Sequence, residues 1–109
     1  MISDDDIERA LDYLRDSVES SAQAKANKVY LTEYRKTKKA ELMNQSNETS
    51  EAAKERFAYS HAEYAEFLTG LRAAIYEDAK HDFLRAAASA KIDAWRTQSS
   101  NERTMGKIV

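Results

Sequence analysis

The chain has 109 residues, of which 33% are charged, and its formal net charge is only −2. It has no proline, no cysteine and only two glycines. These counts argue against turn-rich β folds and exclude disulfides, thiolate nucleophiles and zinc–thiolate sites. The near balance of acids and bases gives no overall bias toward nucleic acid or membrane. The chain is rich in good helix formers, so we expect an all-α fold and a single helical domain spanning residues 1–109.

The first predicted helix spans residues 4–43. Ser3 stands in the N-cap position, and three aspartates follow in the first turn, where the helix dipole favours negative charge. Apolar side chains then recur at spacings of four, three and four, which indicates a seam for a partner helix. This seam consists of Ile7, Leu11, Leu14 and Val18. Beyond Ser20 and Ser21 the apolar positions shift, which predicts a bend there.

The rest of the chain divides at a polar cluster and at a second cap. We expect a loop at residues 44–50, a short helix at residues 51–59, a long helix at residues 61–97 and a frayed polar tail at residues 98–109. Ser60 and Glu63 have capping-box spacing, which places the start of the second long helix. Tyr59 and Tyr64 are spaced as a hydrophobic staple around this cap.

Charge is distributed in blocks along the chain. The net charges are −5 for residues 1–19, +5 for residues 20–40, −5 for residues 41–79 and +3 for residues 80–109. An antiparallel hairpin of the two long helices brings opposite signs together at every contact. Each exposed ion pair contributes under about 1 kcal/mol, so the blocks select a pairing more than they stabilise it. The same charges equally favour a pairing that is swapped between chains.

The two helices carry more apolar surface than one seam between them covers. Each is about 55–60 Å long at 1.5 Å per residue, and a lone hairpin buries only a narrow stripe. We therefore expect a coiled-coil-like homodimer. The side chains expected at its interface are Leu11, Leu14, Val18, Leu68, Leu71, Ile75, Phe83, Ile92 and Trp95. Trp95 fits an interface anchor and a core position equally well.

Residues 25–39 (KANKVYLTEYRKTKK) are the most suggestive binding stretch. Bases that neutralise phosphates, beside aromatic rings that stack on nucleobases, are the chemistry of single-strand binding. The candidate nucleic-acid-binding residues are Lys25, Lys28, Tyr30, Tyr34, Arg35, Lys36 and Lys39. The alternative is a solvated face whose bases pair with the acidic block of residues 41–79. Ion pairs from Lys36 and Lys39 to the acids of residues 51–63 would favour that alternative.

No pattern typical of catalysis or cofactor binding is present. The sequence has no glycine-flanked serine, no Gly-rich phosphate loop and no distinguished carboxylate pair, so we expect no enzyme and no cofactor. One helix face gathers four potential metal ligands, Glu77, Asp78, His81 and Asp82. A di-metal bundle site needs a second Glu-x-x-His helix, so we interpret this cluster as a polar surface patch and expect no metal. The acidic first block also allows a DNA-mimicking inhibitor, although acidic first turns are ordinary caps.

The first residues (MISDDDIERA) are acidic, whereas a secretory signal begins with basic residues and continues with apolar ones. No apolar run approaches the roughly 20 residues that a membrane-spanning helix needs. We therefore expect a cytoplasmic protein without a membrane partner.

Four segments resemble a known group of proteins. They are residues 30–36 (YLTEYRK), 60–64 (SHAEY), 90–98 (AKIDAWRTQ) and 101–106 (NERTMG). Together they look like small helical proteins of tailed temperate phages, encoded among early genes and often near recombination functions. The resemblance covers about residues 20–106 and carries no catalytic signature. It implies a phage-derived protein in the cytoplasm of a bacterial host cell. The expected function is a non-catalytic interaction or accessory role, with a protein partner in DNA recombination or replication.

Overall fold

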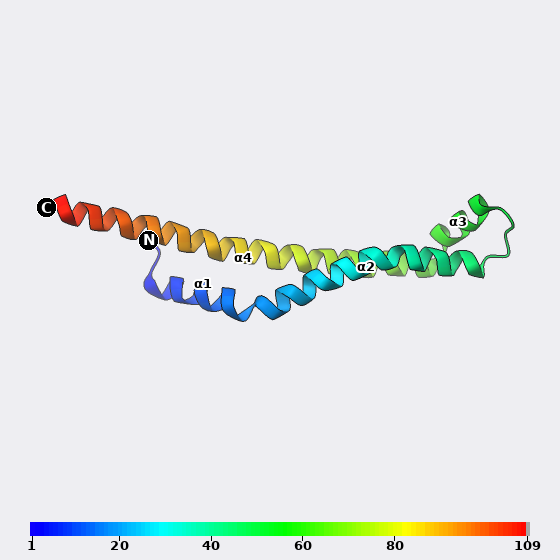
Figure 1. Ribbon diagram of the computed structural model, residues 1–109, viewed down its shortest axis with the longest axis horizontal. Coiled ribbons are helices and arrows are strands. Elements are labelled where there is room, and N and C mark those ends of the chain that lie inside the picture. Colours follow the sequence, from blue (N-terminus) through cyan, green and yellow to red (C-terminus); the bar gives the residue numbers. More distant parts are fainter. Residues whose placement is uncertain (109) are drawn as a thin grey trace. The chain divides into compact units, whose positions relative to one another are not determined.

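The computed structural model describes the backbone of residues 1–108 and the side chains of residues 1–106 (Figure 1). This part of the chain contains four α-helices. They are α1 (Asp4–Asp16), α2 (Val18–Gln45), α3 (Glu51–Ser60) and α4 (Ala62–Ile108). No strand occurs in residues 1–108. The predicted all-α class is therefore confirmed.

Several helix boundaries differ by one or two residues from those expected from the sequence, and two differences are larger. The helix expected over residues 4–43 is divided at Ser17, so the break lies before the bend predicted beyond Ser20 and Ser21. The tail expected to fray is helical as far as Ile108. Gly106 does not adopt a positive φ, so no left-handed cap ends α4 at that residue.

The helix starts follow local hydrogen bonding. The predicted cap of α1 is confirmed, because the Ser3 hydroxyl accepts a bond from the Asp6 amide and the Asp6 carboxylate accepts one from the Ser3 amide. The predicted cap at Ser60 is wrong by one residue. Its hydroxyl donates back to the Arg56 carbonyl at 2.7 Å, and the Glu63 amide donates instead to Nδ1 of His61 at 3.0 Å. A ring nitrogen therefore satisfies this first-turn donor of α4.

The contacts within the chain define two compact units. The first unit consists of Met1–Ala22 with Lys80–Val109, and the second unit consists of Gln23–Ala79. Whether residues 1–109 behave as the single domain expected from the sequence stays a prediction.

In the second unit, α2 and the first part of α4 run antiparallel. Lys28 pairs with Asp78 and Lys38 with Glu63, so residue numbers rise along one helix as they fall along the other. The core of this unit lies at the end that carries α3. It consists of Leu42, Ala58 and Tyr64, with Met43 packed against it. The Tyr59 and Tyr64 rings meet edge to face with centroids 5.2 Å apart, as their staple spacing predicts.

In the first unit, α1 and the start of α2 pack along the later part of α4 (Figure 1). Ser21 approaches His81, and Ser17 approaches Arg85, so this pair of segments is also antiparallel. Ile7 and Ala10 are the buried residues of α1, and Ala88 is buried on α4.

The buried seam is displaced from the one that apolar spacing predicts. On α1 and the following residue, positions 7, 10, 14 and 17 face inward, whereas Leu11 and Val18 are 52% and 56% exposed. The inward spacing of three, four and three uses Ala10 and Ser17, both small. Small side chains let two helices approach closely, and Ser17 also supplies a hydroxyl to its neighbour on α4.

The core is thin. Among the described residues the buried apolar side chains are Ile7, Ala10, Leu42, Ala58, Tyr64, Leu71, Ala74 and Ala88. Half of them are alanines, which bury little apolar area. Leu42 is the large side chain with no exposed surface in this part of the chain. The fold of the second unit should therefore depend strongly on this one residue.

We expect Leu42→Ala to lower the free energy of unfolding by about 2–5 kcal/mol, since it removes buried methyl groups and leaves a cavity. Urea unfolding followed by circular dichroism measures this as a lower midpoint with an unchanged slope. The matched control is Leu84→Ala, which removes the same atoms from a side chain that is 47% exposed. Equal losses in the two variants would contradict the role assigned to Leu42.

Candidate functional site

Three of the five bases in the candidate nucleic-acid-binding face are engaged within the second unit. Lys25 and Lys28 each place Nζ 2.9 Å from an oxygen of Asp78. Lys39 pairs with Glu55 at 3.1 Å, and its Nζ lies 5.1 Å from the centre of the Tyr59 ring. These pairs favour the solvated-face alternative in part, because Lys39 pairs with an acid of residues 51–63 whereas Lys36 does not.

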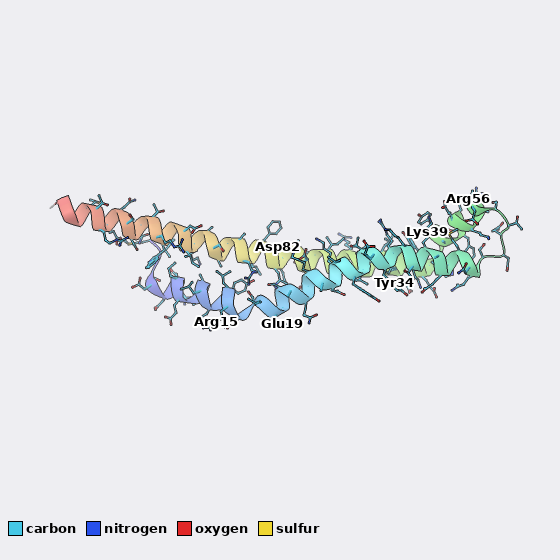
Figure 2. All side chains as sticks on the ribbon, viewed as in Figure 1. Arg15, Glu19, Tyr34, Lys39, Arg56 and Asp82 are labelled. Carbon is cyan, nitrogen blue, oxygen red and sulfur yellow. The ribbon has the colours of Figure 1, made fainter. Side chains whose placement is uncertain are left out.

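The tyrosines of this face stack on one another and on α4. The Tyr34 ring lies 5.9 Å from both Tyr30 and Phe67, and its hydroxyl donates to Glu41. That hydrogen bond to a carboxylate raises the pKa of Tyr34. Tyr34 is half-buried and held in place, whereas Tyr30 is exposed. Figure 2 shows Tyr34 and Lys39 along the same helix.

Arg35 and Lys36 are the candidate bases that stay open to solvent. Lys36 is 80% exposed in its side chain and approaches only Glu33, at 3.7 Å, among the pairs seen here. Together with Lys39, Tyr59 and Tyr64 these two bases line a groove of about 370 Å³. The positive face that remains is therefore smaller than the sequence indicates.

Asp78 is a buried carboxylate between two helices. Its side chain is 4% exposed, and Lys25 and Lys28 of α2 each contact one of its two oxygens. The hydrogen bonds from Lys28 and Lys25 hold the pKa of Asp78 below the ordinary aspartate value of 3.8. A buried charge of this kind is costly unless paired, so the three residues act as one structural unit.

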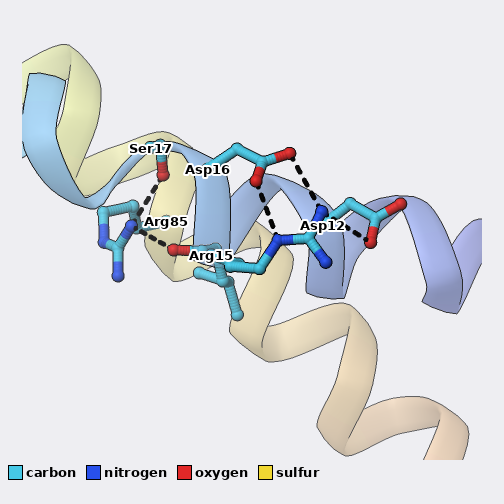
Figure 3. A network of polar contacts seen from close by, with 6 residues as sticks. Asp12, Arg15, Asp16, Ser17 and Arg85 are labelled. Carbon is cyan, nitrogen blue, oxygen red and sulfur yellow. Dashed lines mark hydrogen bonds and ion pairs between the residues drawn. The ribbon is translucent and has the colours of Figure 1, made fainter.

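Arg85 accounts for the break between α1 and α2. Its Nη1 donates to the Leu14 carbonyl at 3.0 Å and to the Ser17 hydroxyl at 2.6 Å (Figure 3). A side chain that occupies a backbone acceptor interrupts the helical hydrogen-bond ladder and kinks the helix. On the outer side of α1, Arg15 pairs separately with Asp16 and Asp12. The guanidinium of Arg85 thus joins α1, the kink and α4 within the first unit.

The residues predicted to form a dimer interface divide into two groups. Leu71 is buried within its own unit, and Leu14, Ile92 and Trp95 are partly buried. The others keep large exposed areas. They are Leu11, Val18, Leu68, Ile75 and Phe83. The second group offers the larger apolar surface to another molecule.

Other candidate sites are weaker. A groove of about 270 Å³ in the first unit has walls of Ala87, Ala88 and Leu84, and the buried Tyr13 hydroxyl on its lining has no hydrogen-bond partner among the described residues. No group of three or more potential metal ligands occurs in the described residues. None of the helices described between residues 1 and 108 has the length and apolar content that a bilayer crossing demands.

Sequence reasoning missed Arg85 and assigned Asp78 to a surface patch. A signal for both was present. The positions of α4 that face inward recur in alternating steps of three and four, beginning at Tyr64. In the second unit they are residues 64, 67, 71, 74 and 78, and in the first unit they are residues 81, 85, 88, 92 and 95. Polar residues at such positions indicate buried polar contacts between helices.

Comparisons with known proteins add no family to this picture. No protein-family model, no curated protein and no solved structure matches the chain. Its function must therefore be argued from its own geometry.

We expect acid to destabilise the protein partly through Asp78. Its pKa is lower in the folded state, so the unfolded chain binds more protons as pH falls below about 4, and stability decreases there. The pKa of Asp6 is lowered to about 2 by its bonds to Ser3 and Arg9, so protonation of Asp6 also lowers stability at acid pH. In Asp78→Asn, the fall in Tm between about pH 6 and pH 3 should be smaller than in the wild type.

The control for this measurement is Asp93→Asn, which removes one carboxylate of an exposed pair with Arg96. It should keep the acid dependence of the wild type. An Asp78→Asn variant with the same acid dependence as the wild type would contradict the role of the buried pair.

We expect Arg85→Met to loosen α1, because it leaves the Leu14 carbonyl and the Ser17 hydroxyl without this donor. The free energy of local opening of residues 4–21 should fall by about 1–3 kcal/mol. Hydrogen exchange measured by mass spectrometry tests this, with residues 30–60 unchanged. Arg96→Met, which removes an exposed guanidinium, is the control; if it increased exchange equally, the kink contact would not be the cause.

Proposed function

We propose that this protein is a non-catalytic helical interaction protein that acts as a homodimer. In this proposal α2 and α4 form an antiparallel, coiled-coil-like hairpin, with α3 in the connection. The observation that carries the proposal is the contrast between a thin core and large apolar side chains left exposed on the same helices. Exposed apolar surface of this kind is typical of binding sites for other proteins.

The coiled-coil part of the proposal rests on the spacing of inward positions. In both units these positions alternate in steps of three and four, which corresponds to positions a and d of a heptad repeat. Several of them are polar, including Ser17, Asp78 and Arg85. Polar residues at such positions specify the register and partner of a helix at some cost in stability.

The cellular role in this proposal comes from the resemblance to phage proteins. It is that of an accessory factor in phage DNA recombination or replication, acting in the cytoplasm of a bacterial host cell. Two of the four potential metal ligands considered from the sequence, Asp78 and His81, instead contact α2.

A second candidate function is single-stranded nucleic-acid binding. Exposed Arg35 and Lys36, close to Tyr30 on the same helix, favour it. The ion pairs of Lys25, Lys28 and Lys39 weaken it, because each of these bases would have to leave an acid before binding a phosphate.

We expect the accessory role to be visible as a specific cross-link in cells that carry the gene. A photo-reactive phenylalanine analogue at Phe83, which is 75% exposed, should capture a protein of DNA recombination or replication, identified by mass spectrometry. Recovery of the protein's own chain alone would overturn the accessory role.

The double variant Arg35→Gln/Lys36→Gln distinguishes nucleic-acid binding from the accessory role. Under the leading proposal the variant captures the same protein as the wild type. Under the alternative, a fluorescent single-stranded oligonucleotide binds the wild type with an affinity that falls steeply between about 50 and 200 mM salt, and the variant binds it weakly at both. Salt-independent binding would contradict the alternative.

A further inference from the structure

Helix α1 and the first residue of α2 carry a third apolar position in each heptad, next to the buried seam. Positions 7, 10, 14 and 17 face inward, and Leu11 and Val18 lie beside them, seven residues apart. Both side chains are more than half exposed. Residues 7–18 therefore carry a wide apolar stripe. Its inward positions are covered within the unit, and Leu11 and Val18 stay exposed.

The start of α4 repeats this arrangement in the second unit. Tyr64, Leu71 and Ala74 are buried, whereas Leu68 and Ile75, again seven residues apart, are 41% and 46% exposed. Val29 on α2 is exposed as well.

Three apolar positions in seven are more than a helix pair needs. A two-stranded coiled coil uses two positions in seven, and a helix that faces the core of a bundle uses three. The sequence of these helices thus matches a bundle of more than two helices. The exposed positions stay uncovered within each unit, so such a bundle needs further helices from outside that unit.

Charge complementarity identifies a second copy of the chain as the partner. Most charges of both segments are paired within the chain, but Asp4, Asp5 and Glu8 on α1 are exposed acids, and Arg35 and Lys36 on α2 are exposed bases. Opposite signs on two segments of one chain are satisfied mutually in an antiparallel dimer, where each copy offers its open acids to the open bases of the other. A neutral or uniformly charged partner would not match both sets.

We propose that two copies pack antiparallel, with the Leu11–Val18 stripe of one copy on the Leu68–Ile75 stripe of the other. This inference rests on the proposed homodimer and specifies the surfaces and the orientation by which the two copies pair. The equal seven-residue spacings bring Leu11 level with the partner's Leu68 and Val18 level with the partner's Ile75. Four helices then share one core, and the exposed third positions become buried.

The same register predicts one intermolecular ion pair. The pairs Lys38–Glu63 and Lys28–Asp78 place Leu68 level with Arg35 on α2. Glu8, about one turn before Leu11 on α1, then lies beside the partner's Lys36. Both side chains are exposed in the single chain.

Sedimentation equilibrium and light scattering at micromolar concentration test the dimer. The wild type should be dimeric, and Leu11→Asp or Ile75→Asp should weaken dimerisation by about tenfold or more, because a carboxylate would be buried unpaired. Phe83→Asp, on the outer face of α4, should leave dimerisation unchanged. A monomeric wild type, or equal weakening by Phe83→Asp, would overturn the proposal.

A charge exchange tests the orientation without touching the apolar stripes. Glu8→Lys and Lys36→Glu should each weaken the dimer, and the double variant should recover most of the loss, because it restores opposite signs at the same contact. Failure of the double variant to recover would overturn the antiparallel register, even if the protein is dimeric.

These outcomes are independent of the test of the accessory role. A dimer that cross-links to no other protein would support the second copy while overturning the accessory role. A monomer that still captures a protein of DNA metabolism would overturn the second copy, and with it the homodimer of the proposed function, but would leave the accessory role intact.

Discussion

Two α-helices that lie side by side bury only a narrow seam, and most features of this protein follow from that constraint. A seam of two positions in seven cannot hold the large apolar residues of a globular core. Here the seam holds several small side chains, such as Ala10 and Ala74, and one cluster around Leu42. The remaining large apolar residues stay on the outer edge of the same helices, where they are available to another molecule.

The seam also contains charged side chains, and each of the two described next has partners there. Asp78 is buried between two lysines, and Arg85 binds a backbone carbonyl and a hydroxyl at the kink between α1 and α2. Unpaired, either group would be costly in such surroundings. Paired, each fixes which residues of the two helices lie opposite one another, because a shift by one turn would separate the partners. Small apolar contacts alone would allow such shifts.

The same pairing limits what the surface can do. Several lysines that look like a nucleic-acid-binding face hold acids of their own unit, so only a small basic region around Arg35 and Lys36 remains open. The apolar stripes are different, since nothing in their unit satisfies them. These contacts therefore support the proposed helix-to-helix recognition better than they support phosphate binding.

The all-α class, the loop before α3 and the start of α1 could be predicted from sequence, because propensity, polar clusters and the Ser3 cap act locally. Among the site residues, the lysines and apolar side chains were recognisable as types, but their partners were not. Spacing alone allows either Ala10 or Leu11 to share a seam with Ile7, because residues three and four positions after Ile7 lie on the same side of the helix. Only the packing of α4 against α1 chose Ala10, and only it brought Arg85 to Ser17, since contacts between residues far apart in sequence depend on how two helix surfaces fit.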